Sequence, residues 1–406
     1  MFADTASFLN CEFGAEAGFL GATFGKGVTF DRILAQGCIF FQPDENGTPV
    51  VFSGPARFLS ARIGKQASFR GVQFCGDANF GRIHFEGAAF FGSMAHPGKV
   101  FSTCFEGTAD FSSAFFDSDV QFEQVTFRRP VRFVGAHFTQ NVRFHAQFEG
   151  KADFGSAVLE RRASFQDSVF RNGAIFSDAR AHVVLFRGAL SDGVPPGENP
   201  QFEGRVDLRG FTYDRIVVAW RELFERLAPY DLQPYEQLEA AVRANGDEWT
   251  AGDVYLARKQ REVRYLWMER RDWSRAAFWS LVGVIARYGV RPVRLIILAL
   301  FVVSRGTWVF SYPDAVVHRE TTREGRDHLY LGWVDAAGVS LKQFLPVEVA
   351  VGRQWVPTDR VFPFLEGSPI PFSFAAYATI HHLAGWVLVP LGVAALSGFL
   401  HRRRRA

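Results

Sequence analysis

Phenylalanine recurs through the first half of the chain in steps of five and six residues, a spacing that neither a helix nor a flat strand produces. The stretch 67–85, ASFRGVQFCGDANFGRIHF, places its rings at 69, 74, 80 and 85, and the alternation continues with interruptions from 52 to 176. A small or β-branched residue precedes most of these rings by two positions. The repeating unit is a pair of short segments spanning 11 residues, each with one small and one large inward side chain. Self-similarity of this kind predicts a stacked array.

An 11-residue hydrophobic period is also compatible with a right-handed helical supercoil. Glycine content excludes it: residues 1–210 hold 25 of the 38 glycines, and each glycine inside a helix costs about 1 kcal/mol relative to alanine. The sum, roughly 25 kcal/mol, exceeds the net stability of a whole domain. Short β-segments joined by tight turns fit instead, because Gly, Asn and Asp tolerate positive φ at corners.

Segments such as ADFSSAFF, ASFQDSVF and ANFGRIHF resemble pentapeptide repeats of the A-(D/N)-(L/F)-x-x type. The resemblance implies a mainly β fold, a right-handed quadrilateral β-helix with the central rings stacked in interior columns. At about 22 residues per coil, residues 1–210 predict roughly nine coils and a rod of about 45 Å. Loops are expected to leave the coils at 42–50, 92–100 and 191–200. The predicted structural core includes Phe69, Phe74, Phe80, Phe85, Phe122, Phe127, Phe133 and Phe138.

The chain begins inside the repeat, with Phe8 already in register. Its first coil is therefore expected to offer a free edge to a protein partner. No basic region followed by an apolar run precedes it, so no signal peptide is expected. The four cysteines, Cys11, Cys38, Cys75 and Cys104, never lie at metal-ligand spacing, and we interpret them as core residues suited to a reducing cytosol.

Aromatic usage changes abruptly near residue 210. All nine Trp and all nine Tyr follow this point, whereas 33 of the 44 Phe precede it. From Ile216 the pattern becomes helical, and residues 211–290 are predicted to form an α-helical adaptor containing two helices separated by Asn-Gly. Basic residues alternate with Tyr and Trp between 258 and 275, which fits either nucleic acid or a solvated or membrane-facing helix. The hydrophobic segment that follows favours the second interpretation, and no nucleic-acid partner is predicted.

Residues 291–406 are predicted to form a membrane region with two transmembrane helices, at about 293–312 and 380–400. Aromatic residues at 308, 310 and 312 would form the far interfacial belt of the first span. Arg305 interrupts that span near its aromatic end, where its long side chain can reach the interface. An outside loop at 313–372 would join the spans.

Arginines set the expected orientation. Three of them, at 287, 291 and 294, flank the start of the first span, and four more follow the second span at 402–405. By the positive-inside rule both flanks lie in the cytoplasm. The prediction is a multi-pass protein of the inner (cytoplasmic) membrane of a bacterial cell, with the repeat domain and both termini in the cytoplasm.

Charge is distributed unevenly between the two parts of the chain. Residues 1–210 hold 22 acidic and 20 basic residues, a balance of −2, and the remainder holds 20 acidic and 25 basic residues, a balance of +5. The basic excess favours contact with anionic lipid. Pentapeptide-repeat proteins that mimic DNA need a dense acidic surface, so the near-neutral repeat region argues against mimicry.

The expected outside loop contains an apolar segment, 334–357, that is too short to span a bilayer. In two-span ion channels this position carries the pore helix and filter, and the C-terminal part resembles such a module through RYGVRPVR and LAGWVLVPLGVAALSGFLHRR. The T-x-G-Y-G filter of potassium channels is absent: LPVEVAVG stands in its place, with Glu348 as its acidic residue. Glu348 would either line an oligomeric pore or pair with Arg305 or Arg353.

Enzyme motifs are missing from the sequence. It contains no G-x-S-x-G, Walker loop, H-E-x-x-H or phosphate-cradling glycine motif. His381 and His382 are adjacent, so on a helix they face about 100° apart and are poor joint ligands for one metal. We therefore predict a non-enzymatic protein with no cofactor, catalytic residue or metal site. Glu348, Arg305 and His382 are the candidate pore or intramembrane polar residues.

Two functions follow from these patterns. The first is a membrane-anchored scaffold whose β-helical rod presents its surface or its N-terminal end to a protein partner. The second is a subunit of an oligomeric two-span ion channel with a non-potassium or degenerate filter, since one two-span chain cannot enclose a pore. The missing filter favours the scaffold.

Overall fold

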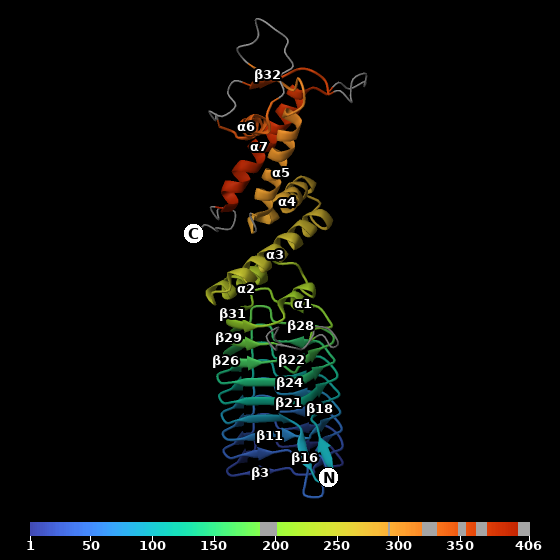
Figure 1. The fold of residues 1–406 in the computed structure, drawn as a ribbon. Helices are drawn as coiled ribbons and strands as arrows, with labels where there is room; N and C mark the ends of the chain where they lie inside the picture. Colours follow the sequence, from blue (N-terminus) through green and yellow to red (C-terminus); the bar gives the residue numbers. More distant parts are fainter. Residues whose placement is uncertain (187–200, 291–292, 319–330, 348–354, 363–371, 397–406) are drawn as a thin grey trace. The chain divides into compact units, whose positions relative to one another are not determined.

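Short parallel strands of two to eight residues stack coil upon coil through the first part of the chain (Figure 1). Ala56 lies opposite Ala78, and Ala109 lies opposite Val131, a step of 22 residues in both pairs. One sheet has nine strands: β1 (Ala6–Ser7), β5 (Val28–Thr29), β9 (Ala56–Arg57), β13 (Ala78–Asn79), β19 (Ala109–Asp110), β22 (Val131–Arg132), β25 (Ala152–Asp153), β28 (Ala174–Ile175) and β30 (Val206–Asp207). The predicted fold is confirmed as a β-solenoid followed by a helical region.

A second, 20-stranded sheet makes up the other sides of the coils. Its strands are β2 (Glu12–Phe13), β3 (Ala17–Gly18), β4 (Thr23–Phe24), β6 (Leu34–Ala35), β7 (Ile39–Phe40), β8 (Val51–Phe52), β10 (Arg62–Ile63), β11 (Ala67–Arg70), β12 (Gln73–Phe74), β14 (His84–Phe85), β15 (Ala89–Gly92), β18 (Cys104–Phe105), β20 (Phe115–Phe116), β21 (Val120–Phe127), β23 (His137–Phe138), β24 (Val142–Phe148), β26 (Val158–Ser164), β27 (Val169–Phe170), β29 (Arg180–Leu185) and β31 (Thr212–Val217).

Phenyl rings from successive coils stack inside the solenoid. In the column Phe58–Phe80–Phe111–Phe133, consecutive ring centroids are 4.8, 4.7 and 4.9 Å apart. Rings of neighbouring columns meet edge to face, as Phe69 and Phe80 do at 5.4 Å. The eight core rings named from the sequence are all buried, with at most 1% of their surface exposed. Burial of each such ring contributes about 1.5–3 kcal/mol to folding.

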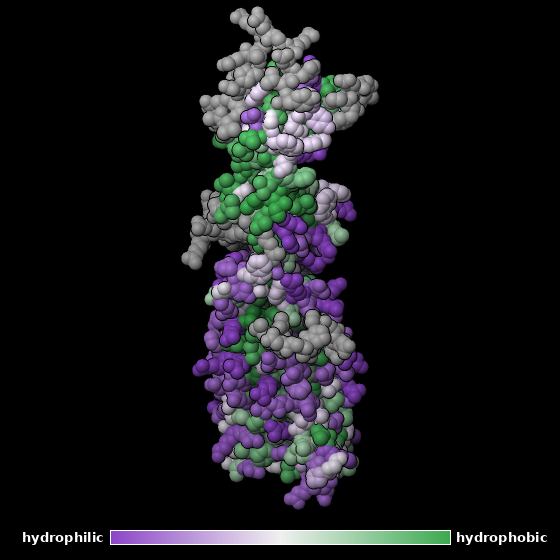
Figure 2. Space-filling view, in the orientation of Figure 1, coloured by the Kyte–Doolittle hydropathy of each residue, from purple (hydrophilic) through white to green (hydrophobic). Residues whose placement is uncertain are grey.

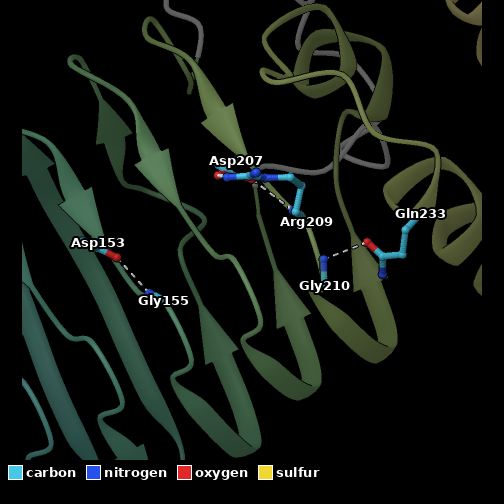
Figure 3. Close-up of polar contacts among 6 residues, drawn as sticks. All are labelled: Asp153, Gly155, Asp207, Arg209, Gly210 and Gln233. Carbon is cyan, nitrogen blue, oxygen red and sulfur yellow. Dashed lines mark hydrogen bonds and ion pairs between the residues drawn. The ribbon is translucent and has the colours of Figure 1, made fainter.

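In several repeats an Asp or Asn side chain closes a corner of the coil. Asp153 accepts a hydrogen bond at 2.9 Å from the backbone N–H of Gly155, and Asp207 accepts one at 3.1 Å from that of Arg209 (Figure 3). Asp110 does the same two residues ahead. These bonds satisfy a backbone donor that the turn would otherwise leave unpaired. Asn or Asp immediately before the inward residue supplies this bond in part of the repeats, whereas others carry Arg, Gln or Ser there, as at Arg132.

Two of the predicted loops leave the stack where the repeat is interrupted. In the loop at 42–50, Asp44 accepts a hydrogen bond from the backbone N–H of Thr48 at 2.8 Å. The other interruption is an antiparallel hairpin of β16 (Met94–His96) and β17 (Lys99–Phe101). The third predicted loop, 191–200, lies outside the described residues.

The strand stack extends past residue 210, where the sequence analysis ended it. β31 pairs with β29 and carries Ile216, from which helix was expected. Tyr213 lies opposite Ala181 and is only 7% exposed, so its ring fills an inward slot as phenylalanine does elsewhere. The repeat therefore continues through Tyr213, despite the change in aromatic composition near residue 210 that suggested a domain boundary.

Glutamine side chains cover the last coil. Gln233 accepts a hydrogen bond from the Gly210 N–H at 3.1 Å (Figure 3), and its amide nitrogen donates to the Phe211 carbonyl at 3.0 Å. Gln237 donates to the Tyr213 carbonyl at 2.9 Å. These contacts occupy backbone groups that a further coil would have paired, so this end of the stack is closed by side chains.

Four helices follow the strands: α1 (Trp220–Glu225), α2 (Gln233–Ala244), α3 (Glu248–Met268) and α4 (Trp273–Ala286). Asn245 and Gly246 separate α2 from α3, and Gly246 has a φ of +82° that suits glycine. The chain divides into two compact units, Met1–Val254 and Tyr255–Ala406. The division into three domains at 210 and 290 stays a prediction.

The second unit is helical. The computed structural model describes residues 1–186, 201–290, 293–318, 331–347, 355–362 and 372–396. After the 3₁₀ turn Arg287–Gly289, this unit contains α5 (Val293–Phe310), α6 (Trp333–Phe344) and α7 (Phe374–Leu396). β32 (Val316–His318) and β33 (Trp355–Pro357) pair antiparallel.

Candidate functional site

Helices α5 and α7 are the two helices in the described part of the chain that are long and apolar enough to cross a membrane. Only 28% of the apolar window of α5 and 22% of that of α7 is buried. A long core helix of a soluble domain would be mostly buried, so these figures leave a large apolar surface without cover. Figure 2 shows this surface as hydrophobic colour gathered over α4, α5 and α7.

The start of α7 differs from the expectation. We predicted the second span from about 380, but α7 begins at Phe374 and contains both His381 and His382. Ser373 accounts for the earlier start, because its hydroxyl accepts a hydrogen bond from the Ala376 N–H at 3.2 Å. The part of the predicted span after Leu396 lies outside the described residues.

A buried polar cluster joins α5, α6 and α7. Ser340 of α6 is fully buried and donates its hydroxyl proton to the Val303 carbonyl of α5 at 2.8 Å. His381 of α7 is 2% exposed, and its Nε2 lies 3.1 Å from the Ser340 carbonyl and 3.3 Å from the Ser340 hydroxyl. Since the serine proton is already used, His381 Nε2 is the donor in this contact.

His382, named from the sequence as a candidate intramembrane site, has both ring nitrogens bonded. The indole nitrogen of Trp386 donates to His382 Nε2 at 2.8 Å. Nε2 is therefore the acceptor, and Nδ1 donates to the Gln343 carbonyl at 2.8 Å. That carbonyl belongs to the last turn of α6, which has no partner within its own helix. His382 thus caps α6 as a neutral imidazole.

Two glycines allow the close helix contacts. A Cβ on Gly306 of α5 would collide with Ser340 and with the His381 ring, and one on Gly385 of α7 would collide with the Phe344 backbone. Small residues at helix contacts are the usual means of close packing in membranes. Sequence reasoning missed both glycines and Ser340. The available signal was glycine inside an otherwise bulky apolar helix.

On the outer surface of the solenoid, acidic side chains contact arginine or histidine side chains of successive coils. Arg143 contacts Glu123 at 3.0 Å, and His84 contacts Asp117 at 2.6 Å. Others join Arg62 to Glu86, Arg128 to Glu106, and His137 to Glu160. Arginine and glutamate thus pair between coils at several positions, and the visible face in Figure 2 is mainly hydrophilic. This pairing agrees with the near-neutral charge of the region.

Comparison with known families identifies the solenoid. The model of pentapeptide repeats (nine copies) matches residues 50–94, 102–146 and 144–190. This part of the chain is a pentapeptide-repeat domain. No curated protein and no solved structure matches the chain.

Of the remaining polar residues named from the sequence, the structure describes Arg305. Arg305 of the helical unit is exposed on α5, and among the described residues it makes no ion pair. Trp308, one turn further on, packs edge to face against Tyr312 at 5.2 Å. Phe310, the third aromatic residue expected in the interfacial belt, is fully buried and therefore does not face outward. Glu348 and Arg353, the expected partners of Arg305, lie outside the described residues.

Neither the pentapeptide-repeat domain nor the helical unit shows a metal centre over the described ranges, where no group of three or more His, Cys, Asp or Glu side chains is placed to hold an ion. The four cysteines are free thiols. Their interpretation as core residues is wrong for Cys75, which is exposed, and the other three are only partly buried. Burial raises the pKa of the Cys104 thiol to about 11, and a hydrogen bond to Glu106 adds to the shift. Cys104 therefore lacks the lowered pKa of a reactive cysteine.

Proposed function

We propose that this chain is a non-enzymatic scaffold anchored in a membrane, in which α5 and α7 hold a pentapeptide-repeat solenoid at the bilayer surface. The observation that carries the proposal is the exposed apolar surface of these two helices. In water an apolar area of this extent would promote association, whereas lipid tails cover it without a further protein. The chain would then be an integral protein of the inner (cytoplasmic) membrane.

The solenoid would serve as the interaction module. Its rings face inward, as expected of a right-handed quadrilateral coil of the pentapeptide-repeat type, so its surface is free to present side chains to a protein partner at its faces or its N-terminal end. Charges on that surface are paired between coils, which does not favour nucleic acid. Assembly of several copies remains part of the proposal.

An ion-conducting pore is not proposed for the helical unit. The buried polar atoms that link α6 to α7 bond to each other: His382 to Gln343, and His381 to Ser340. Because these polar atoms of α6 are already hydrogen-bonded to α7, they are not available to line a pore. A reproducible cation current from the reconstituted chain that falls when Glu348 is replaced by Gln would overturn this choice.

Insertion of α5 can be tested by placing arginine on its lipid-facing side. Leu300 and Phe301 are each 63% exposed near the middle of the helix. The variant Leu300→Arg/Phe301→Arg should lose most of its membrane association, because each arginine costs about 2.5–3.5 kcal/mol at the centre of a span. The measurement is the fraction retained in the membrane pellet after an alkaline wash.

Leu20→Arg is the matched control, since Leu20 is 52% exposed but lies in the solenoid. It should stay in the pellet as the unsubstituted chain does. Recovery of the unsubstituted chain from the aqueous fraction without detergent would contradict the membrane anchor.

Cytoplasmic placement of the solenoid can be tested with its native thiols. Cys75 is exposed, whereas Cys104 is partly buried and has a pKa raised to about 11. At neutral pH a membrane-impermeant maleimide should label Cys75 only after the cells are permeabilised. Cys104 should stay unlabelled until the pH approaches its pKa, because the thiolate is the reactive form. Labelling of Cys75 in intact cells would reverse the orientation.

A further inference from the structure

Helix α4 carries an exposed apolar stripe. Trp273, Phe278, Leu281 and Val284 are 63, 59, 57 and 74% exposed. At 100° per residue these positions fall on one side of the helix. The helix has 14 residues, about 21 Å, which is too short to cross the hydrocarbon core of a bilayer. The helix therefore cannot shield this apolar stripe from water by spanning the bilayer, and the stripe needs another partner.

The opposite side of α4 packs at one end of the two spans. Val282 belongs to the same buried cluster as Leu295, in the first turn of α5, and Leu388 of α7. A tight turn fixes this arrangement. Tyr288 has a left-handed φ of 55° and folds back until its ring meets Gly283 of α4. The exposed stripe is thus held beside the end of α5 where the chain would enter the membrane.

Arginines and tryptophans surround the start of α4. Residues 264–275 contain four exposed arginines, at 264, 270, 271 and 275, and two acidic residues, at 269 and 272, a balance of +2. Trp267 and Trp273 contact edge to face at 5.7 Å, with 39 and 63% of their surfaces exposed. Tryptophan beside arginine is typical of the headgroup layer, where the indole is half buried and the guanidinium meets phosphate.

We propose that α4 is an interfacial helix that lies in the cytoplasmic leaflet. Its apolar stripe enters the boundary between headgroups and acyl chains, and the arginines at 264–275 bind the phosphates of anionic lipids. Charge complementarity and continuity with the apolar surface of α5 identify lipid as the occupant. The inference rests on the proposed membrane anchor. It adds a lipid-binding surface that the length and hydropathy of α4 do not indicate.

The depth of α4 is measured in the full chain. The four native cysteines are replaced by alanine, a single cysteine replaces Leu281, and an environment-sensitive fluorophore is attached. The protein is placed in vesicles of three parts phosphatidylcholine to one part phosphatidylglycerol. A nitroxide near the lipid headgroup should quench the fluorophore at 281 at least twice as strongly as a nitroxide near the chain end. A fluorophore at Leu300, within α5, should show the opposite ratio.

Quenching at positions 281 and 300 distinguishes the interfacial helix from the membrane anchor. Quenching at 300 without quenching at 281 would overturn the interfacial helix and leave the membrane anchor standing. Absence of quenching at both positions would overturn the anchor and, with it, the inference. A fluorophore at native Cys75, in a chain that keeps this cysteine alone, is the control in water and should not be quenched.

Lipid preference is tested by a fluorophore at Ser274 and nitroxide-labelled lipids of two headgroup types. Spin-labelled phosphatidylglycerol should quench at least about twofold more than spin-labelled phosphatidylcholine at equal mole fraction, because each arginine near the surface attracts anionic lipid. The variant Arg270→Gln/Arg271→Gln/Arg275→Gln should lose this difference and keep the depth ratio at 281. Equal quenching by both lipids in the unsubstituted protein would overturn the anionic-lipid site.

Discussion

Replacing Phe116 by alanine is expected to lower the free energy of unfolding of the solenoid by about 3–5 kcal/mol. The ring is fully buried, and it stacks on Phe85 at 5.1 Å and on Phe138 at 4.7 Å. Its removal loses the burial of the ring and leaves a cavity between two coils that the rigid backbone ladders keep apart. The measurement is the midpoint of denaturant unfolding followed by the strand signal in circular dichroism.

The neighbouring Phe115 supplies the control, because both residues belong to strand β20 and differ only in the face they occupy. Phe115 is 46% exposed, and its ring lies 6.0 Å from that of His84 and 5.4 Å from that of His137. Phe115→Ala should cost less than about 1 kcal/mol. Equal losses at the two positions, or a larger loss at Phe115, would contradict the register of the solenoid.

The inward positions of the solenoid were predictable because a core that repeats from coil to coil requires a side-chain pattern that repeats along the sequence. Each coil repeats one geometry, so an inward slot such as that of Phe80 recurs about every 22 residues wherever no loop intervenes, and it is predicted without knowledge of distant contacts. Asn or Asp before the ring adds an independent signal for the corner, as at Asp153. The end of the stack was harder to predict: Tyr213 fills an inward slot with a different aromatic residue, and the caps at Gln233 and Gln237 follow no repeat.

Contacts within the helical unit could not be predicted in the same way. A helix that is apolar on every side has no polar face to show which side meets a neighbour. For α7 the sequence therefore indicated a span but not the side that meets α6. That side depends on Gly385, His381 and His382, whose partners come from a segment some 40 positions earlier. Glu348, the candidate that the sequence emphasised most, lies outside the described residues.

Gly385→Ala is expected to destabilise the helical unit by about 3 kcal/mol or more. The added Cβ would meet the carbonyl group and Cα of Phe344. These are backbone atoms at the end of α6, so no side-chain rotation can relieve the collision. Helix α6 must move away from α7, and this movement breaks the bonds from His382 to Gln343 and from His381 to Ser340.

Gly392→Ala, two turns further along α7, is the matched control. A Cβ at Gly392 has nothing within 4 Å, so this substitution should be neutral or should stabilise the helix by up to about 1 kcal/mol. The same change is thus expected to destabilise the protein at Gly385 and not at Gly392. Thermal unfolding in detergent measures the difference, and hydrogen–deuterium exchange of residues 333–344 locates it. Faster exchange of these residues in Gly385→Ala alone is the expected result, because α6 without its packing against α7 would open its own helical hydrogen bonds more often. Equal exchange in both variants would show that α6 does not pack against Gly385.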